Sequence, residues 1–246
     1  DARPEAIFDL SYGENSTTLA LAFDGLFREL SDEEKKLFVD AAVKRSFKPF
    51  LHVMKAKNKP MYYKHPHTNW NTVCCGGAGM LALAMGDLCK ESEAVLKIVE
   101  ESVEPFFKSL KGDGGWPEGI GYWNYGMRYG FMYLLSWERA TGKKHKLLRL
   151  KGTEATLKFP LQFTPNGVPC SFGDVNRFGV LPFHYAAAER FGADEVTVEL
   201  DRRMTLSSEG RLDGPWPDQA ELALFHPGHE LKVKTRVWDN RILVRG

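Results

Sequence analysis

Apolar side chains recur every three to four residues through the first three quarters of this chain, and this spacing predicts helices. The predicted helices cover residues 15–30, 32–49, 70–88, 92–110, 122–140, 147–159 and 174–191. Residues 31–34 (SDEE) match a capping box at the start of the second helix. Pro49 is expected to bend or end that helix, and Pro182 is expected to kink the last one.

The pattern changes after about residue 220. Residues 231–238 (LKVKTRVW) alternate apolar with polar side chains, and residues 242–244 follow a turn, which predicts a β-hairpin. We therefore expect a mainly α fold over residues 1–218, with the start of a β-sandwich domain or a terminal hairpin over 219–246. Long loops carry the aromatic and histidine residues. This favours an incomplete α/α toroid over a plain helical bundle, whose connections are short.

The charge balance gives no general attraction to nucleic acid. The chain has 33 Lys and Arg against 32 Asp and Glu, a formal net charge of +1. No apolar run approaches the roughly 20 residues that span a bilayer, so we expect no membrane insertion. The four cysteines lack Cys-x-x-Cys spacing, and we expect no metal or other cofactor.

Residues 113–130 (DGGWPEGIGYWNYGMRYG) combine glycines with aromatic side chains. Each glycine inside a helix costs ~1 kcal/mol relative to alanine, so these glycines indicate tight turns or close backbone approach. Flat aromatic faces beside carboxylates suit a sugar ring, and the run predicts a carbohydrate site. Arg128, one helical turn after Tyr125, is expected to push a tyrosine toward phenolate for proton transfer. The alternatives are that the tyrosines pack in the core and that Glu118 holds Arg128.

Two further segments are candidates. Asn69 and Asn71 flank Trp70 at the start of a helix, where amide donors suit a substrate carboxylate. The alternative for Asn69 is a simple N-cap, and for His67 a surface loop position. In residues 171–177, Asp174 is a candidate N-cap, with Arg177 facing a cleft.

Residues 69–77 (NWNTVCCGG) and 113–125 (DGGWPEGIGYWNY) together resemble the heparinase II/III-like polysaccharide lyases. The resemblance covers roughly residues 19–191 and, more thinly, 237–245. It implies an α/α toroid packed against a β-sandwich, with an acidic polysaccharide such as a glycosaminoglycan or alginate between them. It also implies cleavage by β-elimination without a cofactor, and favours a periplasmic or secreted bacterial location over the cytoplasm.

The resemblance also implies roles for individual residues. The family's catalytic tyrosine falls on Tyr122, with Tyr125 as the fallback, and its carboxylate-binding position falls within residues 69–71, with Asn71 as the catalytic candidate. The family's neighbouring histidine falls nearest to His67, because Thr68 stands at the expected position. The substrate-binding candidates are Asn69, Trp70, Trp116, Glu118, Trp123, Tyr125, Arg128, Asp174 and Arg177. The family's β domain is largely missing from this sequence, and we expect it to be needed for activity.

Two rival interpretations remain. A glycoside hydrolase on the same toroid would need two carboxyl groups, for which the candidates are Asp113, Glu118 and Asp174. A non-catalytic carbohydrate-binding toroid needs neither acid nor base.

Overall fold

The computed structural model describes residues 9–55, 65, 68–165, 168–170, 172–174, 178–206, 221 and 224–225. These residues are mainly helical and include no strand, which confirms the predicted mainly α class. The predicted hairpin and the proposed boundary at residue 218 lie outside the described residues. The chain divides into two compact units, Asp1–Ser109 with Tyr125–Leu150 (unit 1) and Leu110–Asn124 with Lys151–Gly246 (unit 2).

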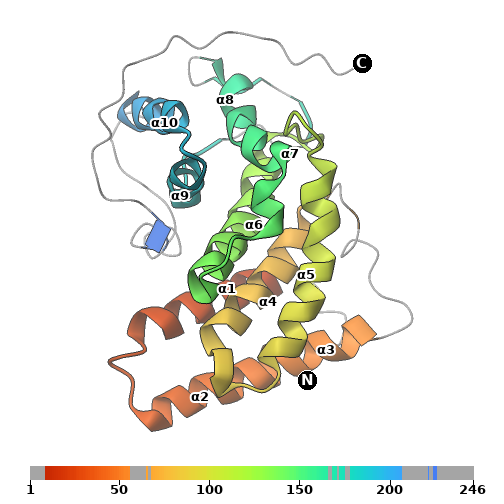
Figure 1. Ribbon diagram of the computed structural model, residues 1–246, viewed down its shortest axis with the longest axis vertical. Helices are drawn as coiled ribbons and strands as arrows, with labels where there is room; N and C mark the ends of the chain where they lie inside the picture. Colours follow the sequence, from red (N-terminus) through yellow and green to blue (C-terminus); the bar gives the residue numbers. More distant parts are fainter. Residues whose placement is uncertain are drawn as a thin grey trace. The chain divides into compact units, whose positions relative to one another are not determined.

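The described part of unit 1 is made of helices, with shorter helical turns between some of them (Figure 1). They are α1 (Leu10–Leu26), α2 (Asp32–Ala42), the π-helical turn η2 (Val43–Phe47), α3 (Lys48–Lys55), α4 (Trp70–Met85), η4 (Gly86–Leu88), α5 (Ser92–Ser109), most of α6 (Ile120–Thr141) and η5 (Lys146–Arg149). Unit 2 contains the first turn of α6 and shorter elements. These are α7 (Lys151–Ala155), η6 (Thr156–Lys158), α8 (Phe159–Gln162), α9 (Pro182–Phe191) and α10 (Asp194–Leu206).

Helix α4 forms the centre of unit 1 and packs against both α1 and α5 (Figure 1). Glycines let its backbone approach α1 closely. A Cβ added at Gly13 would lie 2.1 Å from the carbonyl oxygen of Val73, and one added at Gly77 would lie 2.2 Å from that of Gly13. These contacts are between backbones, so a side chain at either position would force the two helices apart.

Helix α6 also approaches α4 through glycines. A Cβ on Gly76 would lie 2.8 Å from the carbonyl oxygen of Tyr129, and one on Gly126 would lie 3.0 Å from the Cβ of Asn69. The cost of glycine inside α4 and α6 is therefore offset by close helix packing.

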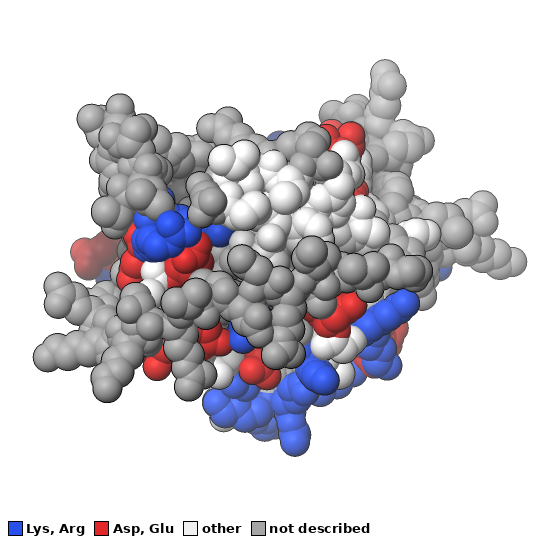
Figure 2. Space-filling model, turned by 90° about the horizontal axis from the view of Figure 1, so that it is seen from above, with Lys and Arg blue, Asp and Glu red and all other residues white. Residues whose placement is uncertain are grey.

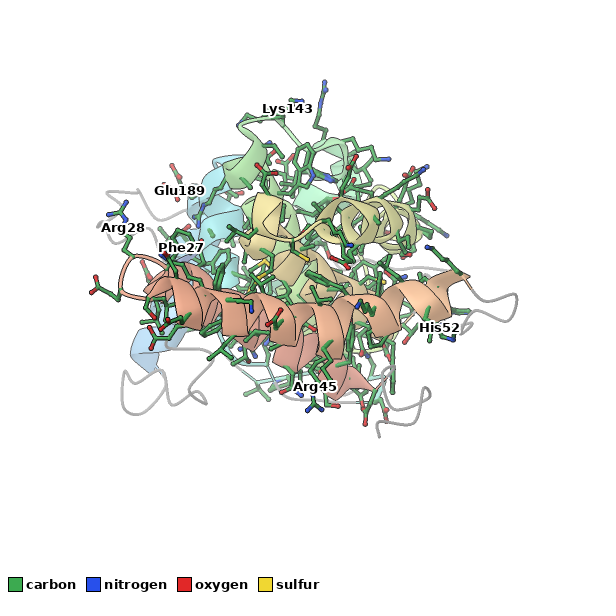
Figure 3. The ribbon with its side chains drawn as sticks, turned by 90° about the horizontal axis from the view of Figure 1, so that it is seen from below. Phe27, Arg28, Arg45, His52, Lys143 and Glu189 are labelled. Atoms are coloured by element: carbon green, nitrogen blue, oxygen red, sulfur yellow. The ribbon has the colours of Figure 1, made fainter. Side chains whose placement is uncertain are left out.

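The predicted capping box is confirmed at the start of α2. The Glu34 amide donates to Ser31 Oγ at 3.3 Å, and the Ser31 amide donates to Glu34 Oε2 at 2.8 Å. The helix does not end at Pro49, because it continues through η2 into α3. The wider π turn lies immediately before the proline and accommodates the ring, which would otherwise clash with the preceding turn. Arg45 and His52 point outward from this run and are exposed (Figure 3).

The predicted helix over residues 174–191 begins later than expected, at Pro182. Leu181 has extended backbone angles (φ −120°, ψ 154°), and Pro182 occupies the first turn of α9 instead of its middle. A residue before proline disfavours the helical region, whereas proline fits the first helical position well. Asp174 therefore does not cap α9, and residues 175–177 lie outside the described residues. Helix α10 was not predicted from the sequence.

A buried histidine joins α5, α6 and η5 in unit 1. His145 Nε2 lies 3.0 Å from both carboxylate oxygens of Glu100, and the Tyr133 hydroxyl donates to the same carboxylate at 2.5 Å. His145 Nδ1 accepts from the Leu147 amide at 3.2 Å, so Nε2 carries the proton that Glu100 accepts. Burial acts to raise the pKa of the Glu100 carboxyl, but the hydrogen bonds from His145 and Tyr133 outweigh it, and the pKa lies below its usual value.

Gly13→Ala should destabilise the chain by about 1–3 kcal/mol, because its Cβ would meet the Val73 carbonyl with nowhere to relax. Gly25→Ala in the same helix is the matched control. A Cβ at residue 25 meets nothing within 4 Å, so this change should stabilise by about 0.5–1 kcal/mol. Urea denaturation checks both values. Equal effects of the two substitutions would contradict the packing described for α1 and α4.

The lowered pKa of Glu100 makes stability depend on pH. Because the folded pKa lies below the unfolded one, the contribution is complete above about pH 5 and is lost as the pH falls through the folded pKa. Glu100→Gln should therefore flatten the acid limb of a plot of unfolding free energy against pH. Glu101→Gln, at an exposed position on the same helix, should leave that limb unchanged. An unchanged limb in Glu100→Gln would contradict the role given to the carboxylate.

Candidate functional site

The predicted site residues fall into both units. Those in unit 1 are Asn69, Trp70, Asn71, Tyr125 and Arg128, and those in unit 2 are Trp116, Glu118, Tyr122, Trp123 and Asp174. His67 and Arg177 lie outside the described residues. Each group is described within its own unit.

The asparagine motif lies at the N-terminal end of α4. Asn69 is buried at the N-cap position, but it has helical angles (φ −63°, ψ −24°) and its side chain makes no capping bond. Thr68 serves that purpose, because its Oγ1 accepts from the Trp70 amide at 3.3 Å. Asn69 therefore stands at the N-cap position, as the alternative interpretation predicted, but its side chain does not cap the helix.

Asn71 is fully buried in the first turn of α4, on a helix that packs against α5. Its Nδ2 donates to the carbonyl oxygen of Ser102 at 2.8 Å, while its Oδ1 has no hydrogen-bond partner among the described residues. A carboxylate needs a donor, and one of the two N–H groups of Asn71 Nδ2 is already engaged. Because Asn71 is fully buried, contact with a substrate carboxylate requires the side chain to become accessible.

Tyr125 pairs with a carboxylate, contrary to the expectation that a cation would activate it. Its hydroxyl donates to Glu14 Oε1 at 2.6 Å, and burial followed by this hydrogen bond raises the pKa of the phenol. Arg128 lies over the ring of Tyr129, 5.7 Å from its centroid. The prediction that Arg128 would push Tyr125 toward phenolate is therefore wrong, and Tyr125 keeps its proton.

In unit 2, the glycine-rich loop before α6 is held by internal hydrogen bonds. Asp113 Oδ1 accepts from the Gly115 amide at 3.1 Å, and Thr156 Oγ1 donates to the Gly114 carbonyl at 2.6 Å. Gly114 has φ +73°, and a Cβ there would lie 2.2 Å from the Thr156 amide nitrogen. Only glycine combines this left-handed angle with this approach.

A second loop closes against the first one. The Asp174 amide donates to the Glu118 carbonyl at 3.2 Å, and a Cβ on Gly173 would lie 2.5 Å from the same oxygen. Glu118 is half-buried and Asp174 is exposed. The sequence motifs around residues 118 and 174 therefore meet through their backbones.

The tryptophans of the run do not form an open sugar-binding face. Trp116 is 2% exposed and Trp123 is 0% exposed. The Trp123 indole donates to Thr156 Oγ1 at 2.8 Å and stacks on His184, with the ring centroids 5.6 Å apart. Both rings fill the interior of unit 2, so stacking on a sugar, as the sequence suggested, is not available to them as they are placed here.

Tyr122 differs from Tyr125 and Tyr133 of the same helix in the hydrogen bonding of its hydroxyl group. It lies in the first turn of the helix and is half-buried, and its hydroxyl has no hydrogen bond to any described residue. Tyr125 and Tyr133 instead donate to Glu14 and Glu100. Among these three tyrosines, Tyr122 is therefore the one whose hydroxyl no described residue engages.

The sequence did not predict Glu14 as the partner of Tyr125, nor did it predict a buried, neutral His184. Glu14 lies 111 residues from Tyr125, and no local pattern links them. His184 Nδ1 accepts from the Leu181 amide at 2.9 Å, which leaves the proton on Nε2, and burial lowers the pKa of the imidazole to about 3. The ring therefore serves as a neutral stacking partner for Trp123.

Neither the charges on the surface nor the comparisons with known proteins point to one kind of substrate. Acidic and basic side chains lie beside one another on the face in Figure 2. In the described part of the chain, no group of three or more His, Cys, Asp or Glu residues is arranged to hold a metal ion, and no helix has the length and apolar character to cross a membrane. No family model matches the sequence, and no curated protein matches it.

His184 should remain neutral far below the usual range for histidine. Because its folded pKa of about 3 lies below the unfolded value, it contributes stability that is lost as the pH falls from about 6.5 toward 3. Nitrogen-15 NMR of the imidazole should show a neutral Nε2–H tautomer at pH 5, while the chain unfolded in urea should show ordinary titration. A folded His184 that titrates in the usual range would contradict the stacked, buried arrangement.

Proposed function

We propose that this chain is the helical part of a polysaccharide lyase that cleaves a uronate-containing polysaccharide by β-elimination, with Tyr122 as the proton-transfer residue. The availability of the Tyr122 hydroxyl carries this proposal, because the hydroxyls of Tyr125 and Tyr133 are held by carboxylates. The paired motifs at residues 69–77 and 113–125 support it further. The remaining helices then belong to an α/α toroid.

The rigid surroundings of Tyr122 suit proton transfer. Trp123, the next residue, is fixed by its bond to Thr156 and by the rings around it. Thr156 in turn holds the glycine-rich loop through Gly114. A catalytic group mounted on a packed scaffold keeps its geometry without reorganisation during the reaction, which is where much of catalytic power originates.

The chemistry of elimination matches the proposed residues. A base takes the C5 proton of the uronate, the C4–O bond breaks, a C4–C5 double bond forms, and an acid protonates the leaving oxygen. The negative charge that develops on the carboxylate is stabilised by donors at the N-terminal end of α4, where the helix dipole favours an anion. Asn69 supplies an amide group there, and Asn71 supplies the second N–H of its Nδ2. Tyr122 transfers a proton at one or both steps.

The proposal extends to partner and location. The partner is an acidic polysaccharide or oligosaccharide, bound by Trp70, Glu118, Arg128 and Asp174 in addition to the asparagines. His67 and Arg177 keep their proposed roles. The expected location is periplasmic or extracellular.

A glycoside hydrolase is the second candidate, because the Asp174 amide and the Glu118 carbonyl bring two acidic residues onto neighbouring backbones. Hydrolysis needs a pair of carboxyl groups on either side of the bond. Asp113 stays a third candidate for that pair, although one of its carboxylate oxygens accepts from the Gly115 amide. Loss of cleavage in Glu118→Gln, without formation of unsaturated product by the unmodified chain, would favour this candidate.

Tyr122→Phe should reduce elimination by roughly 10²–10⁴-fold, the usual contribution of a general acid or base, while binding is kept. The assay is the ultraviolet absorbance of the unsaturated product on alginate and on glycosaminoglycans. Tyr125→Phe removes a hydroxyl that is held by Glu14, and it should lower kcat far less than Tyr122→Phe does.

Full activity in Tyr122→Phe would overturn the assignment of the catalytic tyrosine. Binding of the polysaccharide without any cleavage by the unmodified full-length protein would instead support a carbohydrate-binding protein.

A further inference from the structure

A carboxylate bridges α1 and α6 beside the N-terminal end of α4. Glu14 accepts the hydrogen bond from Tyr125 at 2.6 Å. Gly13, the residue before Glu14, packs against the Val73 carbonyl, and Gly126, the residue after Tyr125, packs against the Cβ of Asn69. Both ends of the bridge are therefore anchored to the first turns of α4, next to the proposed carboxylate-binding residues.

The bridge leaves part of the carboxylate open. Tyr125 bonds only Oε1, Glu14 is exposed, and its other oxygen has no bond to a described residue. Tyr125 is itself held, because its ring meets the ring of Tyr129 edge-on at 5.5 Å. The raised pKa of Tyr125 keeps its proton in place, so the tyrosine stays a donor to Glu14. The Glu14 carboxylate is therefore a negatively charged hydrogen-bond acceptor that Tyr125 holds in position.

Such an acceptor distinguishes sugar substituents by simple chemistry. A free sugar hydroxyl donates a hydrogen bond to a carboxylate, and a charge-assisted bond is stronger than a neutral one. A sulfate ester at the same position has no proton to donate and carries a negative charge, so it is repelled. Binding beside Glu14 therefore favours a hydroxyl over a sulfate.

We propose that Glu14, held in place by Tyr125, is a specificity-determining residue that accepts a hydrogen bond from a sugar hydroxyl and selects uronate polymers lacking sulfate at that position. This inference rests on the proposed function and names its substrate class. It predicts that unsulfated polymers such as chondroitin or heparosan are better substrates than their sulfated counterparts.

The test compares polymers that share a backbone. For the unmodified full chain, kcat/KM on chondroitin should exceed that on chondroitin sulfate by roughly tenfold or more, the usual worth of a hydrogen bond to a charged group. Heparosan and heparan sulfate form a second pair. Glu14→Gln keeps the shape and removes the charge, so it should reduce this preference by roughly tenfold. Glu101→Gln makes the same charge change at an exposed position on α5 and should leave the preference intact.

Binding separates this inference from the lyase proposal. The same polymer pairs are titrated onto Tyr122→Phe, with and without Glu14→Gln, and followed by tryptophan fluorescence. Cleavage with an unchanged preference in Glu14→Gln overturns the role of Glu14 and leaves the lyase standing. A preference in binding that Glu14→Gln reduces, without cleavage by the unmodified chain, overturns the lyase and supports Glu14. A preference for the sulfated polymer, or no binding of either, overturns the inference.

Discussion

The contact of helix backbones around α4 determines where everything else in unit 1 lies. Gly13 and Gly77 let α1 and α4 approach until one backbone touches the other, and Gly76 and Gly126 do the same for α6. Three helices thus meet at a spacing that larger residues would forbid. The same contacts place Asn69 and Asn71 at a buried helix end and set Glu14 opposite Tyr125. The close packing of these helices therefore also positions the side chains proposed to bind substrate.

The tyrosines of α6 differ in whether a carboxylate accepts a hydrogen bond from the hydroxyl group. Tyr125 and Tyr133 each donate to a glutamate, and in both cases burial followed by the carboxylate raises the pKa of the phenol. A phenol with a raised pKa is a poor base and a firmly held donor. Tyr122 is not restrained in this way by any described residue. The proposed division of labour, with Tyr122 transferring protons and Tyr125 orienting Glu14, follows from these pairings.

Local signals in the sequence were enough for most of the helices. The capping box at Ser31, the apolar spacing of α5 and the glycine after α6 depend on neighbouring residues only. The start of α9 was missed because proline was assigned to the middle of a helix instead of its first position. Candidate site residues were harder to assign, since burial is not a local property. Trp123 is a residue type that can stack on a sugar ring, but it lies in the interior. The hydrogen-bond partner of Tyr125 is 111 residues away in the sequence.

The central claim is that a uronate polymer is cut by elimination, and isotopic labelling of the products tests it most directly. The full-length protein is incubated with an unsulfated uronate polymer in water enriched in oxygen-18, and the products are weighed by mass spectrometry. Elimination adds no water, so one new end should be lighter by a water molecule and neither end should carry the label. Oxygen-18 at the new reducing end would show hydrolysis and would contradict the account.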